Sequence, residues 1–413
     1  MSGTDVLSNK PCPIAIIGGG AGGCLCAYFL IKAGYEVTVF DKSRPLATLL
    51  PTGGGRCNLA HAEYDFKELA KNYPRGEKFL YSIFSRFSTY DTIALFEELG
   101  IKTYAQENGR IFPASNSAKE VREKILEKIK KAEFVKEKVT GIEVIEGGYK
   151  ITTENPSPAS VTFAGGSRTA APSPARGEGK ECSRWWFPQV VIAIGGKSSF
   201  NILKNLNINI IEPKPSLVGL NCDIKMPAGI VLKNVLSKDL NIKDDMLFTH
   251  FGISGPLTYT ISSIKARENF PYKLSFDLHP EDFELQKLLN LYPHKDFKNI
   301  LSGILPLNFA KAFLEELAEI KACKIDGKTR DYVLNKIHNF ELTVTGTNKG
   351  EETVTAGGVD LSEINPKTME AKRHRNLYFI GEVLDIDGFC GGFNLQNAWS
   401  TAFVAAENIK SSY

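Results

Sequence analysis

The stretch Ile14–Asp41, IAIIGGGAGGCLCAYFLIKAGYEVTVFD, decides the fold of this chain. Four apolar residues, Ile14–Ile17, predict a buried strand, and the glycines after them predict a sharp turn. A helix is predicted from Cys24 to about Ala33, and a second strand over Glu36–Phe40. Strand, glycine turn, helix and strand in this order are typical of an α/β domain that binds a dinucleotide.

The glycines of this turn fit the pattern Gly18-x-Gly20-x-x-Gly23, and Asp41 follows 23 residues after Gly18. Gly18 would permit the tight turn, Gly20 would let a pyrophosphate approach the backbone, and Gly23 would let helix and strand pack closely. The helix N-terminus offers N–H groups to phosphates, and Asp41 would accept hydrogen bonds from a ribose. The alternative is a structural glycine turn, which the complete context of strand, helix, strand and acid disfavours.

The length of 413 residues predicts two or three packed units. A hydrophobic fraction of 43% and a charged fraction of 23% are ordinary for a globular protein in water, and a net charge of +3 does not indicate nucleic acid or an anionic membrane as partner. The first dozen residues lack an apolar signal-peptide core, and glycines interrupt the longest apolar stretch, Ile14–Leu30. We therefore expect no signal peptide, no transmembrane helix and a cytoplasmic location.

The eight cysteines contain no CxxC pair, which favours reduced thiols over a dithiol reductase. The six histidines show no metal-ligand spacing, so no metal site is predicted. His250, in FTHFGISGP, and Cys390 are weak candidates for a catalytic acid or base. The alternatives are a histidine that only supports a turn and a cysteine that is only small.

The segment Thr52–Asn58, TGGGRCN, combines exposed backbone N–H groups with the permanent charge of Arg56. Such a segment can close over a phosphate or hold the flat edge of a ring system, whereas a flexible surface loop is the alternative. Helical patterns follow over Asp65–Gly100. Ile101–Pro113 then predicts two strands joined by a turn at Asn108-Gly109.

The block Asn155–Arg184 differs in composition, because Pro, Gly, Ser and Ala make up 18 of its 30 residues. This composition buries too little apolar surface to order itself, so we expect a disordered insertion (155–184) between two strands of a meander. Composition shifts again near Lys197 and near residue 342. The expected domains are a cofactor domain (1–196 and 342–413) and an inserted substrate-side domain (197–341), β-rich over 212–279 and helical over 280–341.

The last part of the chain again has the pattern of a buried strand followed by glycines and a helix. Leu377–Ile380 predicts a short buried strand, and the loop after it carries acidic residues between Glu382 and Asp387. Two glycines, Gly391 and Gly392, lead into a helix predicted from about Leu395. The N-terminus of that helix would favour the negative charge that a flavin ring gains on reduction, and the acids could bind ribityl hydroxyl groups.

The chain resembles the YhiN/BaiN-like FAD-binding flavoproteins, often labelled predicted NAD(P)/FAD-dependent oxidoreductases or aminoacetone-oxidase-family enzymes. The resemblance covers nearly the whole chain outside the low-complexity block. It implies non-covalent FAD and a glutathione-reductase-type, Rossmann-like FAD-binding domain built from both chain ends, with an inserted β-rich and helical domain. The motifs that carry it are GGGAGG, TGGGRCN, ENGRIFP, FTHFGISGP, TAGGVDLSEINPKTM and GEVLDIDGFCGGFNLQNAW.

The resemblance also implies a cofactor site at the positions that match the family's motifs. The glycine turn matches its pyrophosphate loop, Asp41 its ribose acid, and the segment from Gly391 its flavin-facing turn. The expected cofactor-binding residues are Gly18, Gly19, Gly20, Ala21, Gly22, Gly23, Asp41, Lys42, Gly54, Gly55, Arg56, Cys57, Asn58, Val139, Gly195, Gly381, Glu382, Asp385, Gly391, Gly392, Phe393 and Asn394.

Two departures from the family pattern lie near this site. After Gly195-Gly196 the family continues with a loop of the kind PxxGSTGDGY, whereas this chain has GGKSSF followed by ILKNLNINI. Before GGGRCN the family tends to carry basic residues, whereas this chain has ATLLPT. Together with the insertion, these departures leave open a decayed protein that binds FAD without turnover.

The sequence predicts a FAD-dependent oxidoreductase that transfers hydride or electrons between NAD(P)H or a small organic substrate and a small-molecule acceptor or dioxygen. No second GxGxxG pattern is present, so NAD(P)H would enter the substrate cleft transiently, unless the substrate itself reduces the flavin. The alternative is a flavoprotein of tRNA modification, which a basic patch with interleaved aromatic residues would indicate. We expect a small-molecule substrate, no nucleic acid and no membrane partner, and the sequence does not predict the oligomeric state.

Overall fold

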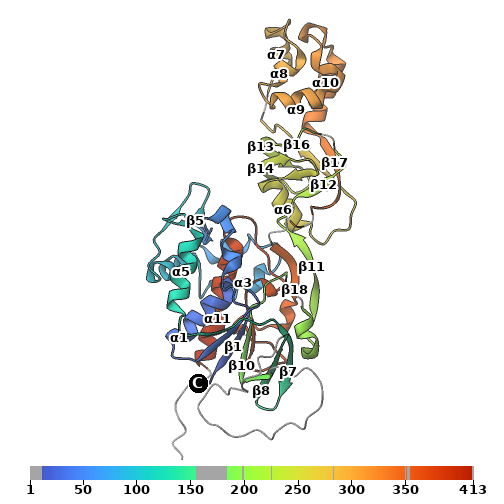
Figure 1. Cartoon of the computed structure of the whole chain (residues 1–413). Coiled ribbons are helices and arrows are strands. Elements are labelled where there is room, and N and C mark those ends of the chain that lie inside the picture. Colours follow the sequence, from blue (N-terminus) through green and yellow to red (C-terminus); the bar gives the residue numbers. More distant parts are fainter. Residues whose placement is uncertain are drawn as a thin grey trace, which may run out of the picture. The chain divides into compact units, whose positions relative to one another are not determined.

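The computed structural model describes residues 12–154, 184–197, 200–224, 226–281, 283–348, 350 and 354–411. The chain forms two compact units (Figure 1): the first unit comprises Met1–Pro213 and Thr355–Tyr413, and the second comprises Lys214–Val354. The second unit therefore begins and ends later than the expected 197–341. Its start is later because Leu203 and Leu206 are buried in the core of the first unit, and its end is later because a barrel strand of the second unit runs past residue 341.

A five-stranded parallel sheet forms the core of the first unit, in the order β19-β10-β1-β2-β6. All four residues of β1 are buried, as is typical of a parallel strand with both faces covered. The sheet joins strands from both ends of the chain, which confirms the predicted α/β class. Its strands are β1 (Ile14–Ile17), β2 (Val37–Phe40), β6 (Glu133–Val135), β10 (Gln189–Ile192) and β19 (Leu377–Phe379).

Two helices of the first unit, α1 and α11, pack against each other. Each begins two or three residues earlier than expected, because Gly20 and Gly392 accept the first helical hydrogen bonds, at 3.0 Å in both cases. Within the part of the chain that the structure describes, no helix has the length and apolar character to cross a membrane. The helices of this unit are α1 (Ala21–Lys32), α2 (Phe66–Ala70), α3 (Glu77–Phe84), α4 (Thr89–Glu98), α5 (Ala118–Lys128) and α11 (Phe393–Ser411).

Smaller sheets flank the parallel sheet. The antiparallel pairing of β8 with β9 gives the expected meander around the low-complexity block. Residues 155–183 of that block lie outside the described residues, and Arg184 is the first residue of β9. The small sheets are β3-β5-β4 (Ala60–His61, Arg110–Pro113, Thr103–Ala105), β7-β8-β9 (Val139–Ile145, Gly148–Thr153, Arg184–Phe187) and β11-β18 (Ile210–Ser216, Val354–Val359).

The second unit contains a closed barrel with the strand order β12-β15-β14-β13-β16-β17. Phe248 of the barrel packs against Phe309 of a following helix, with ring centroids 5.1 Å apart, so barrel and helices share one core. The strands are β12 (Leu220–Cys222), β13 (Ile230–Ser237), β14 (Ile242–Phe248), β15 (Gly252–Ser254), β16 (Tyr272–Asp277) and β17 (Phe340–Thr347). The helices are α6 (Pro256–Ile264), α7 (Leu285–Leu291), α8 (Phe297–Leu301), α9 (Leu307–Leu314) and α10 (Gly327–His338).

Candidate functional site

The candidate site lies at the edge of the parallel sheet where its strands end. Because the strands run parallel, the segments that follow β1, β2, β10 and β19 all leave from this edge. Backbone hydrogen bonds join their first residues: the N–H of Gly18 donates to Phe40 O (2.8 Å), and that of Ile380 donates to Ile192 O (3.0 Å). The glycine turn and the C-terminal loop therefore meet here from opposite ends of the chain.

The glycine turn has one open surface and two crowded positions. A Cβ on Gly18, whose φ is +107°, would lie 2.2 Å from Ala193 O, and a Cβ on Gly23 would lie 1.9 Å from Gly18 O. At Gly20 the nearest atom to such a Cβ is Thr48 Oγ1, at 3.9 Å. The first N–H groups of α1 have no acceptor within the helix, and its first turn contains no acidic residue. A phosphate could therefore approach the turn at Gly20, where no side chain stands in the way.

Asp41 organises the glycine turn. Its Oδ2 accepts the backbone N–H of Gly19 at 2.6 Å, and its Oδ1 accepts the N–H and the hydroxyl group of Ser43, both at 2.7 Å. A carboxylate has about four lone-pair sites, so Asp41 can still accept a hydrogen bond from a ribose hydroxyl. Lys42, the next residue, is exposed.

The TGGGRCN segment forms an exposed loop beside this edge. Gly54 and Gly55 have φ angles of +68° and +85°, and a Cβ on Gly54 would have no atom within 4 Å. The guanidinium carbon of Arg56 lies 4.2 Å from the centroid of the Phe112 ring in β5. The loop thus presents open backbone while Arg56 is held on the neighbouring sheet.

Cys57 and Asn58, the last residues of this segment, turn inward. Burial raises the pKa of the Cys57 thiol to about 12, so it stays protonated at neutral pH. Asn58 Oδ1 is buried, has no hydrogen-bond partner among the described residues, and lies 2.8 Å from the place a Cβ would take on Gly392. A buried acceptor without a partner, beside two glycines, is a position that a ligand N–H group can satisfy.

The glycine pair before α11 packs closely against β3 and its neighbouring side chains. A Cβ on Gly392 would lie 2.3 Å from Ala60 O, so only glycine fits. Asn394 uses its side chain within the loop, because its amide accepts from and donates to the backbone of Gly388 at 2.9 and 2.8 Å. The N–H groups of the first turn of α11, including that of Phe393, have no acceptor within the helix and carry the positive end of its dipole.

The loop after β19 places two acids differently. Glu382 Oε1 accepts the N–H of Thr355 at 2.9 Å, and burial raises the pKa of Glu382 to about 7. Gly381, just before it, donates its N–H to Thr401 Oγ1 at 2.9 Å, which fixes the loop to α11. Asp385 is buried, with 6% of its surface exposed. Glu382 therefore changes charge near neutral pH at the edge where the cofactor is expected.

Asp387, in the same loop, forms a buried ion pair. Its side chain is fully buried, and both carboxylate oxygens accept hydrogen bonds from the guanidinium group of Arg75, whose side chain is 11% exposed. This buried ion pair ties the loop after β19 to the segment between α2 and α3. Whether Asp387 also accepts a hydrogen bond from a ribityl hydroxyl group stays a prediction.

The remaining sequence candidates do not all gather at this edge. Gly195 follows β10 with a φ of +72° and open space around it, whereas Val139 lies in β7 and pairs with Thr153. His250 is exposed in the second unit. Cys390 is exposed in the first unit, directly before the glycine pair, with Arg110 Nη2 at 3.8 Å from its Sγ.

His61 is a functional candidate that the sequence did not indicate. Its ring stacks on Phe393 with centroids 4.6 Å apart, and its Nδ1 lies 3.1 Å from Gly391 O. Because a carbonyl oxygen only accepts, Nδ1 carries the proton of the neutral ring and Nε2 bears the lone pair. Burial lowers the pKa of His61, which favours this neutral form. No local pattern could have found it, since β3 has two residues.

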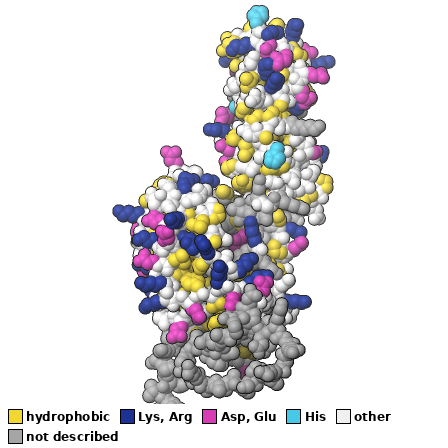
Figure 2. All heavy atoms as spheres, in the orientation of Figure 1, with side chains coloured by type: hydrophobic (Ala, Val, Ile, Leu, Met, Phe, Trp, Pro, Cys, Tyr) yellow, Lys and Arg dark blue, Asp and Glu magenta, His cyan; other side chains and the backbone are white. Residues whose placement is uncertain are grey.

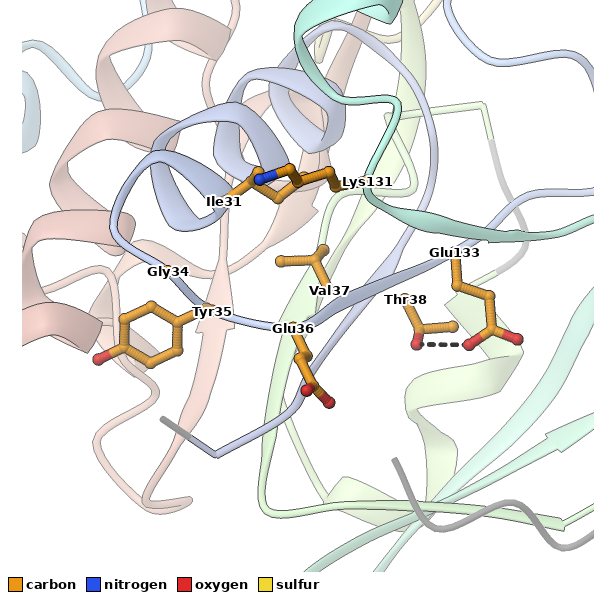
Figure 3. Close-up of a pocket in the computed structure, with 8 residues that line it drawn as sticks. All are labelled: Ile31, Gly34, Tyr35, Glu36, Val37, Thr38, Lys131 and Glu133. Atoms are coloured by element: carbon orange, nitrogen blue, oxygen red, sulfur yellow. Dashed lines mark hydrogen bonds between the residues drawn. The ribbon is translucent and has the colours of Figure 1, made fainter. Parts of the chain in front are cut away.

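A separate cavity of about 430 Å³ opens elsewhere on the first unit (Figure 3). It lies at the start of β2, beside Tyr35 and Glu36, whereas Asp41 follows the other end of that strand. Thr38 and Glu133 meet at its wall through a hydrogen bond of 3.2 Å. The cavity is therefore not part of the candidate site.

Fold and glycine turn together define a class: an α/β protein with a Rossmann-type parallel sheet, the architecture of dinucleotide-binding proteins. A model of the family described as HI0933-like protein Rossmann domain matches residues 12–408. The chain belongs to this family and is a FAD-binding oxidoreductase. The predicted family resemblance and the predicted Rossmann-type fold are confirmed.

Characterised relatives cover almost the full length of this chain. The "Ribosomal RNA dihydrouridine synthase" of Escherichia coli (strain K12) is 27% identical, and the one of Haemophilus influenzae is 28% identical. The "3-dehydro-bile acid delta(4,6)-reductase" of Clostridium scindens is 29% identical. Each alignment spans 95% of this chain and 97% of the relative.

Proposed function

We propose that this protein is a FAD-dependent reductase that saturates a carbon–carbon double bond conjugated to a carbonyl group, with NADH or NADPH as the source of electrons. Two kinds of relative carry names that share this chemistry. Dihydrouridine arises when the C5=C6 bond of uracil, conjugated to the C4 carbonyl, is reduced, and a delta(4,6)-reductase of a 3-dehydro-bile acid acts on double bonds conjugated to a ketone. The proposal takes this shared reaction as the activity of the present chain.

One observation carries the assignment of the cofactor to this site. Two helices that follow strands of one parallel sheet, α1 and α11, both begin after glycines, and the unpartnered Asn58 Oδ1 lies beside Gly392. The residues fit FAD: the glycine turn would hold the pyrophosphate and Asp41 a ribose. Asn58 and the N-terminus of α11 would hold the flavin ring, and Glu382 and Asp385 would bind hydroxyl groups of the ribityl chain.

When bound, FAD supplies the two-electron chemistry, accepting hydride from the nicotinamide and donating it to the substrate. The N-terminus of α11 would stabilise negative charge on the reduced ring. Saturation of the double bond adds one hydride and one proton, so a protein group or water must deliver the proton. Cys390 Sγ, directly before the glycine pair, can carry one, and the protonated Nδ1 of His61 lies beside Gly391.

Transient binding of NADH or NADPH is part of the proposal. The sequence contains one GxGxxG turn, and this turn lies at the sheet edge where the proposal puts FAD. The nicotinamide nucleotide would therefore enter and leave by the route that the substrate uses. This arrangement predicts that reductant and substrate bind alternately to one site.

The test is an anaerobic half-reaction series on the purified holoprotein. NADH or NADPH should bleach the flavin band, and 2-cyclohexen-1-one or a uridine-rich RNA should restore it faster than buffer does. Deuterium at the transferred position of the reductant should appear in the saturated product. Bleaching without reoxidation by either substrate would overturn the proposed reaction, and reoxidation by dioxygen alone would indicate an oxidase. A flavin that no reductant bleaches would support a decayed protein.

A further inference from the structure

One face of the small sheet β3-β5-β4 carries aromatic and basic side chains side by side. His61 pairs with Arg110 across β3 and β5, and Tyr104 pairs with Phe112 across β4 and β5. Residues directly opposite each other share a face, and so do residues two apart on one strand, such as Arg110 and Phe112. Arg56 covers the Phe112 ring from the neighbouring loop. These residues, Arg56, His61, Tyr104, Arg110 and Phe112, are called the β5 face below.

Two flat groups of the β5 face, the Tyr104 ring and the Arg56 guanidinium, lie outside the Phe112 ring, which is itself buried. Tyr104 is 37% exposed, and its ring centroid lies 6.3 Å from that of Phe112. The Arg56 guanidinium is held over Phe112 by the ring contact and by a 3.1 Å hydrogen bond from its Nε to Gly53 O. Bases of single-stranded RNA stack on such tyrosine rings and guanidinium planes, at about 1–3 kcal/mol per base.

The charge of the β5 face is positive and uncompensated. Within the described residues, the contacts of Arg56 and Arg110 are to Gly53 O, the Phe112 ring and Cys390 Sγ, and neither guanidinium forms an ion pair. The charge of Glu63 acts on His61, and that of Arg110 does too, in the opposite direction. Figure 2 shows Lys and Arg side chains, with Asp and Glu side chains among them, on the side of the first unit that carries α5. Guanidinium groups without carboxylate partners complement the phosphates of a nucleic acid.

The β5 face leads to the candidate cofactor edge. At its inner end His61 stacks on Phe393, the first residue of α11, and Arg110 contacts Cys390, which directly precedes the glycine pair. A strand that stacks a base on Tyr104 would therefore bring a neighbouring base toward the start of α11. That is the place where the proposed function requires the conjugated double bond to lie.

From this arrangement we infer that the β5 face binds a single-stranded segment of RNA and that the base reduced at the cofactor edge is a uracil. The inference rests on the proposed function for the reaction and adds the substrate class and the surface that holds it. In the reaction, NADH or NADPH is oxidised by two electrons, hydride is added to C6 of the uracil, and a proton is added to C5. The aromatic and basic patch that would distinguish an RNA-directed flavoprotein would then be formed by five residues from four segments: the loop before β3, and the strands β3, β4 and β5.

Binding of a fluorescein-labelled, uridine-rich 12-nucleotide RNA, measured by anisotropy at about 50 mM salt, tests the surface. Tyr104→Ala and Arg110→Ala should each weaken binding about 10-fold, corresponding to about 1.4 kcal/mol. Tyr104→Phe should bind as the unaltered protein does, because it keeps the ring. Arg110→Ala should also lower the slope of log affinity against log salt by about 0.7. Tyr90→Ala and Lys138→Ala, exposed positions of the first unit outside the face and outside α5, are the matched controls and should bind normally.

Two further readouts separate the outcomes. Each variant is checked for bound FAD and for its melting temperature, and a 4-thiouridine RNA is crosslinked to the unaltered protein, where it should label peptides that contain Tyr104 or Arg110. Equal affinity of all variants, crosslinks elsewhere, or no binding at low salt would overturn the inference. If the protein reduces 2-cyclohexen-1-one yet binds no RNA, the inference fails while the proposed function stands. If it binds RNA at the β5 face but reduces neither substrate, the reaction fails while the surface stands.

Discussion

Gly23→Ala is predicted to disrupt the glycine turn on which the cofactor site depends. The Cβ of an alanine would lie 1.9 Å from Gly18 O and 3.1 Å from Gly18 C. Carbon and oxygen atoms of neighbouring groups normally stay at least about 3.3 Å apart, so α1 and the turn would have to separate by about 1.4 Å. The atom in the way is a backbone carbonyl oxygen, which cannot move aside as a flexible side chain would.

The size of the effect follows from that displacement. Overpacking typically costs about 1–3 kcal/mol and occasionally more, and a backbone clash of this depth places Gly23→Ala at about 3 kcal/mol or above. For a unit of this size such a loss lowers the melting temperature by about 6–12 °C. The turn would also move relative to the pyrophosphate site, so the purified variant should contain little FAD.

Gly22→Ala is the matched control, one residue earlier in the same helix. Its Cβ would have Ala398 O as nearest atom at 3.5 Å, an ordinary contact. Alanine is also favoured over glycine in a helix by about 1 kcal/mol, so this variant should melt at the same or a slightly higher temperature and keep its FAD. The assays are thermal unfolding and the ratio of flavin to protein absorbance. Equal behaviour of the two variants, or a Gly23→Ala protein with normal FAD content and melting temperature, would refute the reasoning.

Three other predictions concern the buried groups of the site. Arg75→Met leaves a buried carboxylate without its partner and should cost about 3–5 kcal/mol, seen as a lower melting temperature, whereas Lys32→Met, which breaks an exposed ion pair, should change it little. Burial raises the pKa of Glu382 to about 7, above its ordinary 4.5, so its contribution to apoprotein stability is full below about pH 4.5 and is lost as pH rises through about 7. The melting temperature of Glu382→Gln minus that of the unaltered protein should therefore increase from pH 5 to pH 8. A difference that stays constant over this range would contradict the prediction. N-ethylmaleimide should label the exposed Cys390 and spare Cys57, whose buried thiol has a pKa of about 12; rapid labelling of Cys57 in the folded protein would show that the segment opens.

Much of the fold was predictable because its signals are local. The run Ile14–Ile17 is β1 as predicted, and the pair of strands over Ile101–Pro113 appears as β4 and β5 around the predicted turn. Gly23 could be assigned to close packing because the spacing of the turn fixes which glycine lies against the strand. The closed barrel was not predictable beyond "β-rich", because its closure pairs Leu220 with Thr347.

The site was less predictable, because its side chains meet through long-range pairing. The β5 face depends on the partners of β5, and the two-residue strand that contributes His61 has no pattern of its own. Asp387 has the sequence context of a ligand, but only the structure shows that Arg75 takes both of its oxygens. The charge of an acidic or basic residue can be read from the sequence, whereas its ion-pair partner is known only once the fold is known.

The most direct test of the account is the visible spectrum of the purified protein after incubation with FAD and removal of the excess. The account predicts absorption near ~450 nm from one non-covalently bound FAD per chain, bleached anaerobically by NADH or NADPH. A protein that stays colourless after reconstitution would contradict the assignment of the sheet edge to FAD.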